Sequence, residues 1–422
     1  MIKVLKLNIL ELVLLILSLL IPFMHPLKAM FPYLSYIDEF VVVLCCGAFL
    51  YSTVIARNRI SKIEFKIIVF FLLFISVGII SNCASEVLRP YISIMTDIFS
   101  YGKFIFVSIG GFYLFKNSKS AKFIYSETIK IVRIIVIIGA FLAVANQFID
   151  FGMRDGSRYG IFCFKYVYDS AAILSWYCYT FMLLLTIDLL RGFSSYKILV
   201  ICLNMIMWIC TARSRGFAFI TIYLILFFVW RIKEKRNKEM KLHFEYIIAL
   251  GMVALAVAWD QLVFYFTTAT EARSILLHVG ISLSMQFFPF GAGLGTFGTA
   301  AAQKYYSPVY SSYGIDNIYG FRSDNPLYLT DTFWPAVVGE TGVIGLILYI
   351  CLIFCIFKHF YKKLSINNLS RFLIIYVFIT LICSSIATSV FAQNATIGDL
   401  FYLCMIPALL NRTKLHEQKH KY

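Results

Sequence analysis

Residues 67–80 read IIVFFLLFISVGII, directly after the basic block from Arg57 to Lys66. An α-helix through such an apolar run crosses most of a hydrocarbon core about 30 Å thick, and basic residues mark its cytoplasmic end. Apolar runs of spanning length recur from Leu7 to Leu410, with short basic blocks between them. The sequence therefore predicts an all-α integral membrane protein.

Composition excludes a soluble globular protein. Hydrophobic residues make up 60% of the 422 residues and charged residues 14%, whereas soluble domains have roughly 45–50% and 25%. That much apolar surface cannot be buried inside one aqueous domain. Because no soluble linker or internal repeat divides the chain, we expect residues 1–422 to form a single polytopic membrane domain.

The apolar runs predict about twelve transmembrane helices. The first runs from Leu12 to Phe23, and we keep it as a helix because no signal-peptide cleavage site follows. Asp97 and Lys103 interrupt the fourth, so its start could lie anywhere from Tyr91 to Lys103. The fourth span centres near Ile105. The remaining ten spans centre near Cys46, Phe74, Ile137, Phe181, Met205, Leu224, Leu255, Leu348, Val377 and Met405.

The charge of +16 is a topology signal. Most Lys and Arg residues fall in short blocks between apolar runs, and such blocks stay in the cytoplasm. This places both termini in the cytoplasm and predicts contact with anionic lipid rather than with nucleic acid. The blocks are Lys3 to Lys6, Arg57 to Lys66, Lys116 to Arg133, Arg191 to Lys197, Arg231 to Lys241, Lys358 to Arg371 and Arg412 to Lys421.

The eleven cysteines predict neither a disulfide framework nor a metal site. They are scattered through apolar runs without C-x-x-C spacing or clustered histidines, which is typical of small packing residues in membrane helices. We therefore expect no metal and no cofactor.

A helical hairpin is predicted between Lys197 and Arg231, because both flanks are basic and the segment is too long for one span. Its tip carries Arg213 and Arg215. A helix from Ile198 to Cys210 rises only about 20 Å, so both arginines should lie below the outer membrane surface. Either they snorkel or pair with a carboxylate, or they bind an anionic ligand at the outer leaflet.

Two further segments are expected outside. Residues 150–168 carry Arg154, Asp155, Arg158 and Lys165 between glycines, and could be a solvated loop or a functional one. Residues 264–335, between the expected helices nine and ten, form a much longer segment. Loops of this length are usually functional or disordered. Because this one is rich in Tyr, Phe and Gly and poor in charge, we expect it to fold against the outer membrane face.

The motif Gly293-Leu294-Gly295-Thr296-Phe297-Gly298 matches the dinucleotide pattern G-x-G-x-x-G. We reject a nucleotide site, because no β-α-β context surrounds the motif and the segment is expected outside. Either the glycines permit a chain reversal with positive φ, or their backbone N–H groups approach a pyrophosphate.

Charged residues flank this motif on both sides. Arg273 precedes it and starts an apolar stretch that could form a helix on the membrane surface. The charged residues that follow it include Arg322, Asp324, Asp331 and Glu340. Such a set is typical of a binding site, although an ion-pair network would have the same composition.

Several of these pieces, in this order, resemble the O-antigen and capsule repeat-unit polymerase family, which is related to the O-antigen ligases. They are Arg158-Tyr159-Gly160, the tip Ser214-Arg215-Gly216, Arg273 ahead of the run from Pro289 to Phe297, and Asp331 to Trp334 leading into Glu340-Thr341-Gly342. The resemblance covers roughly residues 154–348.

The resemblance implies a GT-C-like glycosyltransferase in the bacterial inner membrane. Such enzymes transfer a growing glycan from undecaprenyl pyrophosphate to the next lipid-linked repeat at the outer leaflet, alongside a flippase and a chain-length regulator. Binding of the pyrophosphate is then expected of Arg213, Arg215, Arg273, Arg158 and Arg322, and acid–base work of Asp331, Glu340 and Asp324. We favour Asp331 as the base that takes the proton of the acceptor hydroxyl, or as a ligand of that hydroxyl. The alternative is a structural role, in which Asp331 caps the next helix or pairs with Arg322.

Three other functions are weighed. A ligase of the same family carries a histidine in the large outer loop, but here His278 lies before the glycines, which favours a polymerase. A flippase of lipid-linked oligosaccharides should have short loops on both sides, unlike residues 264–335. A secondary transporter predicts an inverted repeat, which the sequence lacks.

Overall fold

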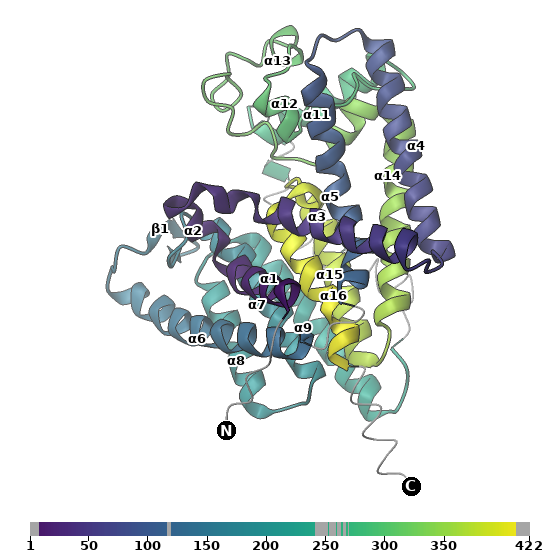
Figure 1. The fold of residues 1–422 in the computed structure, drawn as a ribbon. Helices are drawn as coiled ribbons and strands as arrows, with labels where there is room; N and C mark the ends of the chain where they lie inside the picture. The colour runs from purple at the N-terminus through teal and green to yellow at the C-terminus, as the bar shows by residue number, and fades with distance from the viewer. Residues whose placement is uncertain are drawn as a thin grey trace.

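The computed structural model describes residues 8–115, 120–240 and 270–410, together with Met252, Trp259, Val263, Phe264, Thr267 and Thr268. Helices dominate (Figure 1). The first half contains α1 (Ile9–Leu20), η1 (Ile21–Phe23), α2 (Met24–Met30), η2 (Pro32–Tyr36), α3 (Ile37–Leu50), η3 (Tyr51–Ile55), α4 (Lys62–Ser85), α5 (Tyr91–Phe115), α6 (Ala121–Phe148), β1 (Arg154–Arg158) and β2 (Ile161–Phe164). The second half contains α7 (Ala171–Leu190), α8 (Ser195–Ile209), α9 (Ser214–Lys235), α11 (Ala272–Gln286), α12 (Ala300–Lys304), α13 (Val309–Ser312), α14 (Trp334–Leu364), α15 (Asn368–Ser385), η4 (Val390–Ala392) and α16 (Asn394–Leu410).

These helices lie where the sequence predicts membrane spans. Within the described residues, nine helical segments are long and apolar enough to cross a membrane, and α8 and α16 are shorter apolar helices. The fourth predicted span begins at Tyr91, the earliest of the starts left open. The predicted span centred on Leu255 lies outside the described residues. The chain is thus a multi-pass helical membrane protein, while twelve spans and their orientation stay predictions.

Local sequence signals start several of these helices. Ser61 and Glu64 form a capping box at the start of α4, in which each side chain bonds the other residue's backbone N–H. Asn8 and Glu11 do the same for α1. Because a helix start leaves N–H groups without partners, these pairs fix where the apolar helices begin.

Long helices pack in pairs around one apolar core. Figure 1 shows α4 and α14 running side by side, and α3 packs along α5. Lys103 of α5 explains one polar interruption of the fourth span, because its Nζ donates to Asp38 Oδ2 at 2.7 Å and Glu39 Oε1 at 3.1 Å on α3. A buried cation is tolerated there because it is paired.

Residues 154–164 form the only β-hairpin of the described chain. Strands β1 and β2 pair antiparallel, with Arg158 opposite Ile161. The guanidinium group of Arg154 lies 3.8 Å from the centre of the Phe162 ring and donates to the Asn146 carbonyl. The first predicted outer loop is therefore an ordered hairpin, a small exception to the all-α prediction.

The segment 272–333, here called the cap, has a hydrophobic cluster of its own. This cluster joins α11, with Leu276 and Leu283, to α13, with Tyr310. Figure 1 shows α11, α12 and α13 together at the end of the α4 and α14 pair. The predicted helix that starts near Arg273 is present as α11, and it packs against α14. The described part of this long segment is thus folded, as its composition predicts.

Candidate functional site

The glycine motif forms a tight chain reversal at the base of the cap. Gly293, Gly295 and Gly298 have φ values of +96°, +75° and +71°. A side chain at Gly293 would place its Cβ 1.9 Å from Asn82 Oδ1, so this position accepts only glycine for steric as well as conformational reasons. The chain-reversal interpretation of the motif is confirmed.

The backbone N–H groups of the reversal bind carboxyl groups of the protein itself. Thr296 N and Phe297 N donate to Glu340 Oε1 at 2.9 and 3.1 Å, and Gly295 N donates to Asp97 Oδ2 at 2.8 Å. The alternative interpretation, in which these groups bind a pyrophosphate, is wrong because the N–H groups are already occupied. The motif is instead a nest for two carboxyl groups.

Glu340 is fully buried at the turn of α14 that faces this nest. Besides the two backbone N–H groups, its carboxyl accepts from Thr299 Oγ1 at 3.2 Å and from Tyr101 Oη at 3.0 Å. Within the described chain Glu340 pairs with neither Arg213 nor Arg215, because backbone N–H groups and hydroxyls already surround its carboxyl.

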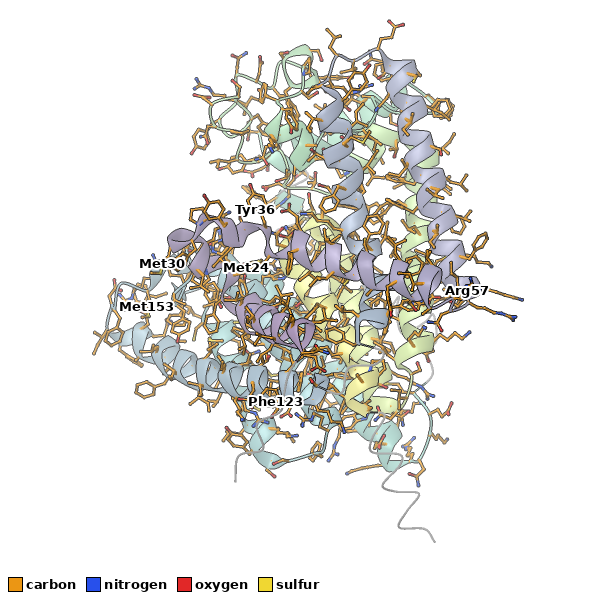
Figure 2. The ribbon with its side chains drawn as sticks, in the orientation of Figure 1. Met24, Met30, Tyr36, Arg57, Phe123 and Met153 are labelled. Atoms are coloured by element: carbon orange, nitrogen blue, oxygen red, sulfur yellow. The ribbon has the colours of Figure 1, made fainter. Side chains whose placement is uncertain are left out.

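A cavity of about 630 Å³ lies beside the nest, between the cap and the helices below it. Its wall is built by residues from α2, α5, α7, α9 and α12 and by the segment around η4. Figure 2 shows Met24 of this wall on the same folded-back N-terminal segment as Tyr36. The polar groups of the wall include His25, Lys28, Asp97, Thr299, Gln303, Asp331, Gln393 and Asn394, together with Arg215.

Arg215 brings a guanidinium group to the cavity from the first turn of α9. It lies 4.9 Å from the centre of the Trp176 ring and donates to the Ala172 carbonyl at 3.2 Å. In the part of the chain that the structure describes, no carboxylate pairs with it. The positive charges of Arg213 and Arg273 act on it from nearby. A guanidinium group that has no carboxylate partner in the described chain and lies in a partly buried place favours an anion as ligand.

Arg213 differs from Arg215 in having a carboxylate partner. Its Nη2 atom lies 2.9 Å from Asp155 Oδ2, and the same oxygen accepts from Ala171 N at the start of α7. The hairpin β1–β2 thereby holds the tip between α8 and α9. Of the two interpretations of the hairpin tip, pairing with a carboxylate describes Arg213. Arg215 has no carboxylate partner in the described chain, so it stays a candidate for binding an anionic ligand.

Asp331 also lies in the cavity wall, just before α14. Burial raises the pKa of its carboxyl above the ordinary 3.8, and the positive charge of Arg273 opposes this rise. Asp331 does not cap α14, whose N-cap is Phe333 without a side-chain bond. Nor does it pair with Arg322. The Asp331 carboxyl therefore belongs to the cavity wall, and the positive charge of Arg273 lies near it.

The remaining candidates lie on the surface. Arg322 Nε is 3.3 Å from Asp324 Oδ1, and both side chains are mostly exposed, at 56% and 67%. Arg158 is exposed on β1. None of these three is among the described residues that line the cavity. Of the candidates, Arg215 and Asp331 line the cavity, and Arg213 and Arg273 are charges near them. Arg158, Arg322 and Asp324 lie on the surface instead.

Sequence reasoning missed three acidic or basic residues of the wall: His25, Lys28 and Asp97. His25 Nδ1 lies 3.4 Å from Asp169 Oδ2. The signal for Asp97 was present, because a lone acid inside an apolar run is costly unless it has a function or a partner. His25 and Lys28 follow the first span at once, which gave no signal of a site.

Comparison with known protein families finds no family model that matches this sequence, and comparison with curated proteins finds no match. The chemistry of the site therefore rests on its residues. Within the described chain, no cluster of three His, Cys, Asp or Glu side chains could hold a metal ion. The cavity wall combines the guanidinium group of Arg215, the carboxyls of Asp97 and Asp331, and neutral amides and hydroxyls beside aromatic rings. This combination suits a ligand with both anionic and hydroxyl groups.

Proposed function

We propose that this chain polymerises lipid-linked oligosaccharide repeat units at the outer face of the bacterial inner membrane. It would transfer the growing glycan from undecaprenyl pyrophosphate to the next lipid-linked repeat, for O-antigen or capsule. One observation carries the proposal: Arg215 lines a cavity among membrane helices with no carboxylate partner in the described chain, and Arg213 and Arg273 stand nearby. This arrangement supports an anionic leaving group held beside the bilayer.

The arginines suit the leaving group of this reaction. When the glycosidic bond forms, a pyrophosphate departs and its negative charge grows. Guanidinium groups bind phosphate oxygens through a planar two-pronged fork. A positioned donor at a developing charge is typically worth about 10²–10³ in rate, or roughly 3–4 kcal/mol. Arg215 would contribute this stabilisation directly, and Arg213 and Arg273 would strengthen the local positive potential.

Asp331 is the carboxyl best suited to the acceptor. A sugar hydroxyl that attacks an anomeric carbon gains from a nearby proton acceptor, typically by about 10²–10⁴. Burial raises the pKa of Asp331, which makes its carboxylate a stronger base than an exposed aspartate. It would bind the acceptor hydroxyl and receive its proton while the arginines hold the pyrophosphate.

An apolar groove beside the cavity supports a substrate with a long hydrocarbon chain. It has a volume of about 680 Å³ and lies between α14 and α15, with Trp334, Phe354 and Phe378 among its lining residues. The rings of Trp334 and Phe333 are 5.3 Å apart, and Phe333 belongs to the wall of the polar cavity. Pyrophosphate and polyprenyl chain would thus lie in adjoining sites.

The orientation is a separate part of the proposal. We propose twelve spans, cytoplasmic termini, and an outer position for residues 150–168 and 264–335. Cysteines placed at Asn237 and Asn367 should react with a membrane-impermeant thiol reagent only after the inner face is opened, and cysteines at Gly156 and Asp316 in intact cells. Labelling of the Asp316 position only from inside would overturn both the orientation and the mechanism.

Removal of the gene tests the function. Loss of a polymerase should leave surface lipid that carries a single repeat, whereas loss of a ligase leaves bare acceptor and loss of a flippase traps repeats at the inner leaflet. The readout is the length distribution of surface glycan. Normal long chains in the deletion strain, in the absence of a second polymerase, would rule the proposal out.

A further inference from the structure

A second cavity lies at the end of α4 that is farthest from the cap. Helix α4 reaches the cap at its last residue, Ser85, whose hydroxyl donates to the Ala292 carbonyl. The helix is 24 residues long, or about 36 Å, so its start at Lys62 lies about one bilayer core away. Figure 2 shows Arg57 in the turn that leads from η3 to α4. The second cavity has a volume of about 310 Å³ and lies between this turn and the ends of α5, α14 and α16.

Two cationic side chains line this cavity, which is here called the basic cavity. Lys363 Nζ lies 3.4 Å from Glu64 Oε1. Glu64 is buried, and its other oxygen accepts from Ser61 N at 2.8 Å and from Tyr113 Oη at 3.1 Å. Arg59 is exposed, and no carboxylate pairs with it in the part of the chain that the structure describes. Glu64 therefore balances the charge of Lys363, while the charge of Arg59 is open to an anionic ligand.

The sequence around the basic cavity carries a large excess of positive charge. Within residues 51–66 and 351–371, Glu64 is the only carboxylate, and the basic residues are Arg57, Arg59, Lys62, Lys66, Lys358, Lys362, Lys363 and Arg371. Basic clusters at the end of a membrane helix attract anionic lipid headgroups. The charge at this end of the molecule is thus complementary to such a headgroup.

An apolar groove adjoins the basic cavity. It has a volume of about 750 Å³ and lies along α3 and η3, with Val43, Gly47 and Tyr51 among its lining residues. Val43 and Tyr51 are 58% and 62% exposed, so the groove is open at the surface. Asn58 and Tyr113 line both the groove and the basic cavity. A cationic site and an open apolar groove therefore meet at shared side chains.

We propose that the basic cavity and the groove together bind one anionic phospholipid. Its phosphate lies at Arg59, whose guanidinium fork binds phosphate oxygens, and one acyl chain lies in the groove. A soluble phosphate would leave the groove empty, so the adjoining groove favours a lipid. Because the site lies at the other end of α4 from the cap, the inference does not depend on the proposed polymerase function.

Lipid binding to the purified full chain tests the headgroup position. Native mass spectrometry of the delipidated protein measures the Kd for phosphatidylglycerol and for phosphatidylcholine with the same acyl chains. The parent should prefer phosphatidylglycerol about fivefold, because the choline group cancels the charge of the phosphate. Arg59→Ala should weaken phosphatidylglycerol binding about tenfold and remove this preference, because a charge-assisted hydrogen bond is lost.

Arg57 offers a matched control in the same turn. It lies two positions from Arg59 and lines neither the basic cavity nor the groove. Arg57→Ala removes an equal charge, so it should leave both Kd values within about twofold. Equal losses in the Arg57→Ala and Arg59→Ala variants would indicate a general attraction to the basic segment and would overturn the site.

Gly47→Leu tests the acyl-chain position. A Cβ at Gly47 would meet nothing within 4 Å beyond its own helix and chain neighbours, so a leucine side chain can enter the groove without a clash at its base. It should weaken the binding of both lipids about tenfold, because it occupies apolar space that the acyl chain needs. Ser76→Leu adds the same side chain at an exposed position of α4 outside both spaces, and it should leave binding unchanged.

Thermal unfolding in detergent reports any loss of folding, and Arg59→Gln replaces Arg59→Ala if the alanine variant is less stable than the parent. An Arg59 variant that binds phosphatidylglycerol as tightly as the parent overturns the headgroup position. An unchanged Kd in the Gly47→Leu variant overturns the acyl-chain position. If excess inorganic phosphate then displaces the lipid from this variant, the basic cavity is a site for soluble phosphate instead.

Discussion

Two arginine–aspartate combinations of this chain differ in their surroundings. Arg322 and Asp324 pair with each other at the tip of the cap, where both are mostly exposed. Arg215 and Asp331 lie in the wall of one cavity, each partly buried, and Arg215 has no carboxylate partner in the described chain. An exposed pair is screened by water and contributes at most about 1 kcal/mol, whereas a charge in a partly buried wall acts strongly on a ligand.

The path of the chain, rather than the charge pattern, decides which residues form a site. Both combinations consist of the same two residue types. Only the second is carried to the cavity, by α9 on one side and by the segment before α14 on the other. We expect substitutions in the cavity wall to lower activity more than substitutions of the exposed pair.

Loss of the cavity arginine should have the largest effect. Arg215→Ala should reduce surface glycan polymerisation by at least about a hundredfold, because it removes a donor at the developing pyrophosphate charge. Arg273→Ala and Arg213→Ala should also reduce it severely. Arg215→Lys should recover only part of the activity, since a point charge lacks the planar fork. Glycan length distribution in cells, with membrane insertion checked by immunoblot, measures this.

Full-length glycan in cells that carry Arg215→Ala would remove the central element of the site. A loss that appears only together with lower protein amount would assign Arg215 to folding, through its contacts with Trp176 and Ala172.

Asp331→Asn should have the next largest effect. It keeps the shape of the side chain and removes the base, so acceptor binding should stay nearly intact while turnover falls at least about tenfold, a barrier change near 1.4 kcal/mol. The pKa of Asp331 is raised by burial. The parent rate should therefore fall as pH drops through a value above 3.8, where the carboxylate gains its proton, and the variant should lose this acid limb. An unchanged rate and pH profile would exclude Asp331 as the base.

Substitutions of the exposed pair should have the smallest effect. Arg322→Ala and Asp324→Asn should each leave polymerisation and thermal stability within about twofold, because the pair is solvated and lies away from the cavity. Arg158→Ala should behave in the same way. A severe loss in the Arg322→Ala variant, with normal insertion, would mean that the cap tip reaches the substrate.

Hydropathy and local caps made most of the fold predictable. The apolar runs and the basic blocks between them locate the helices of the described chain, since a spanning helix must satisfy its backbone internally. Polar residues within spans could not be assigned in the same way. Lys103 and Asp97 interrupt the same predicted helix, yet the first pairs with α3 and the second enters the nest.

The site was harder to predict because its contacts are distant in sequence. Gly295 and Asp97, which hydrogen-bond to each other, are 198 positions apart. A glycine-rich motif considered alone predicts either a turn or an anion-binding site. Nothing in the local sequence indicates that its N–H groups bind carboxyl groups of the protein itself. The hydrogen-bond partners of Glu340 could not be predicted for this reason. Arg215 was a candidate because two cations at a short hairpin tip are unusual by themselves.

Purified protein supplied with lipid-linked repeats as its only substrate tests the central claim most directly. The account predicts a ladder of longer lipid-linked glycans, with one undecaprenyl pyrophosphate released for each bond formed, and no ladder from the Arg215→Ala variant. A ligase would make no ladder without its own acceptor, and a flippase would make none at all. Intact repeats after incubation with the folded parent protein would contradict the account.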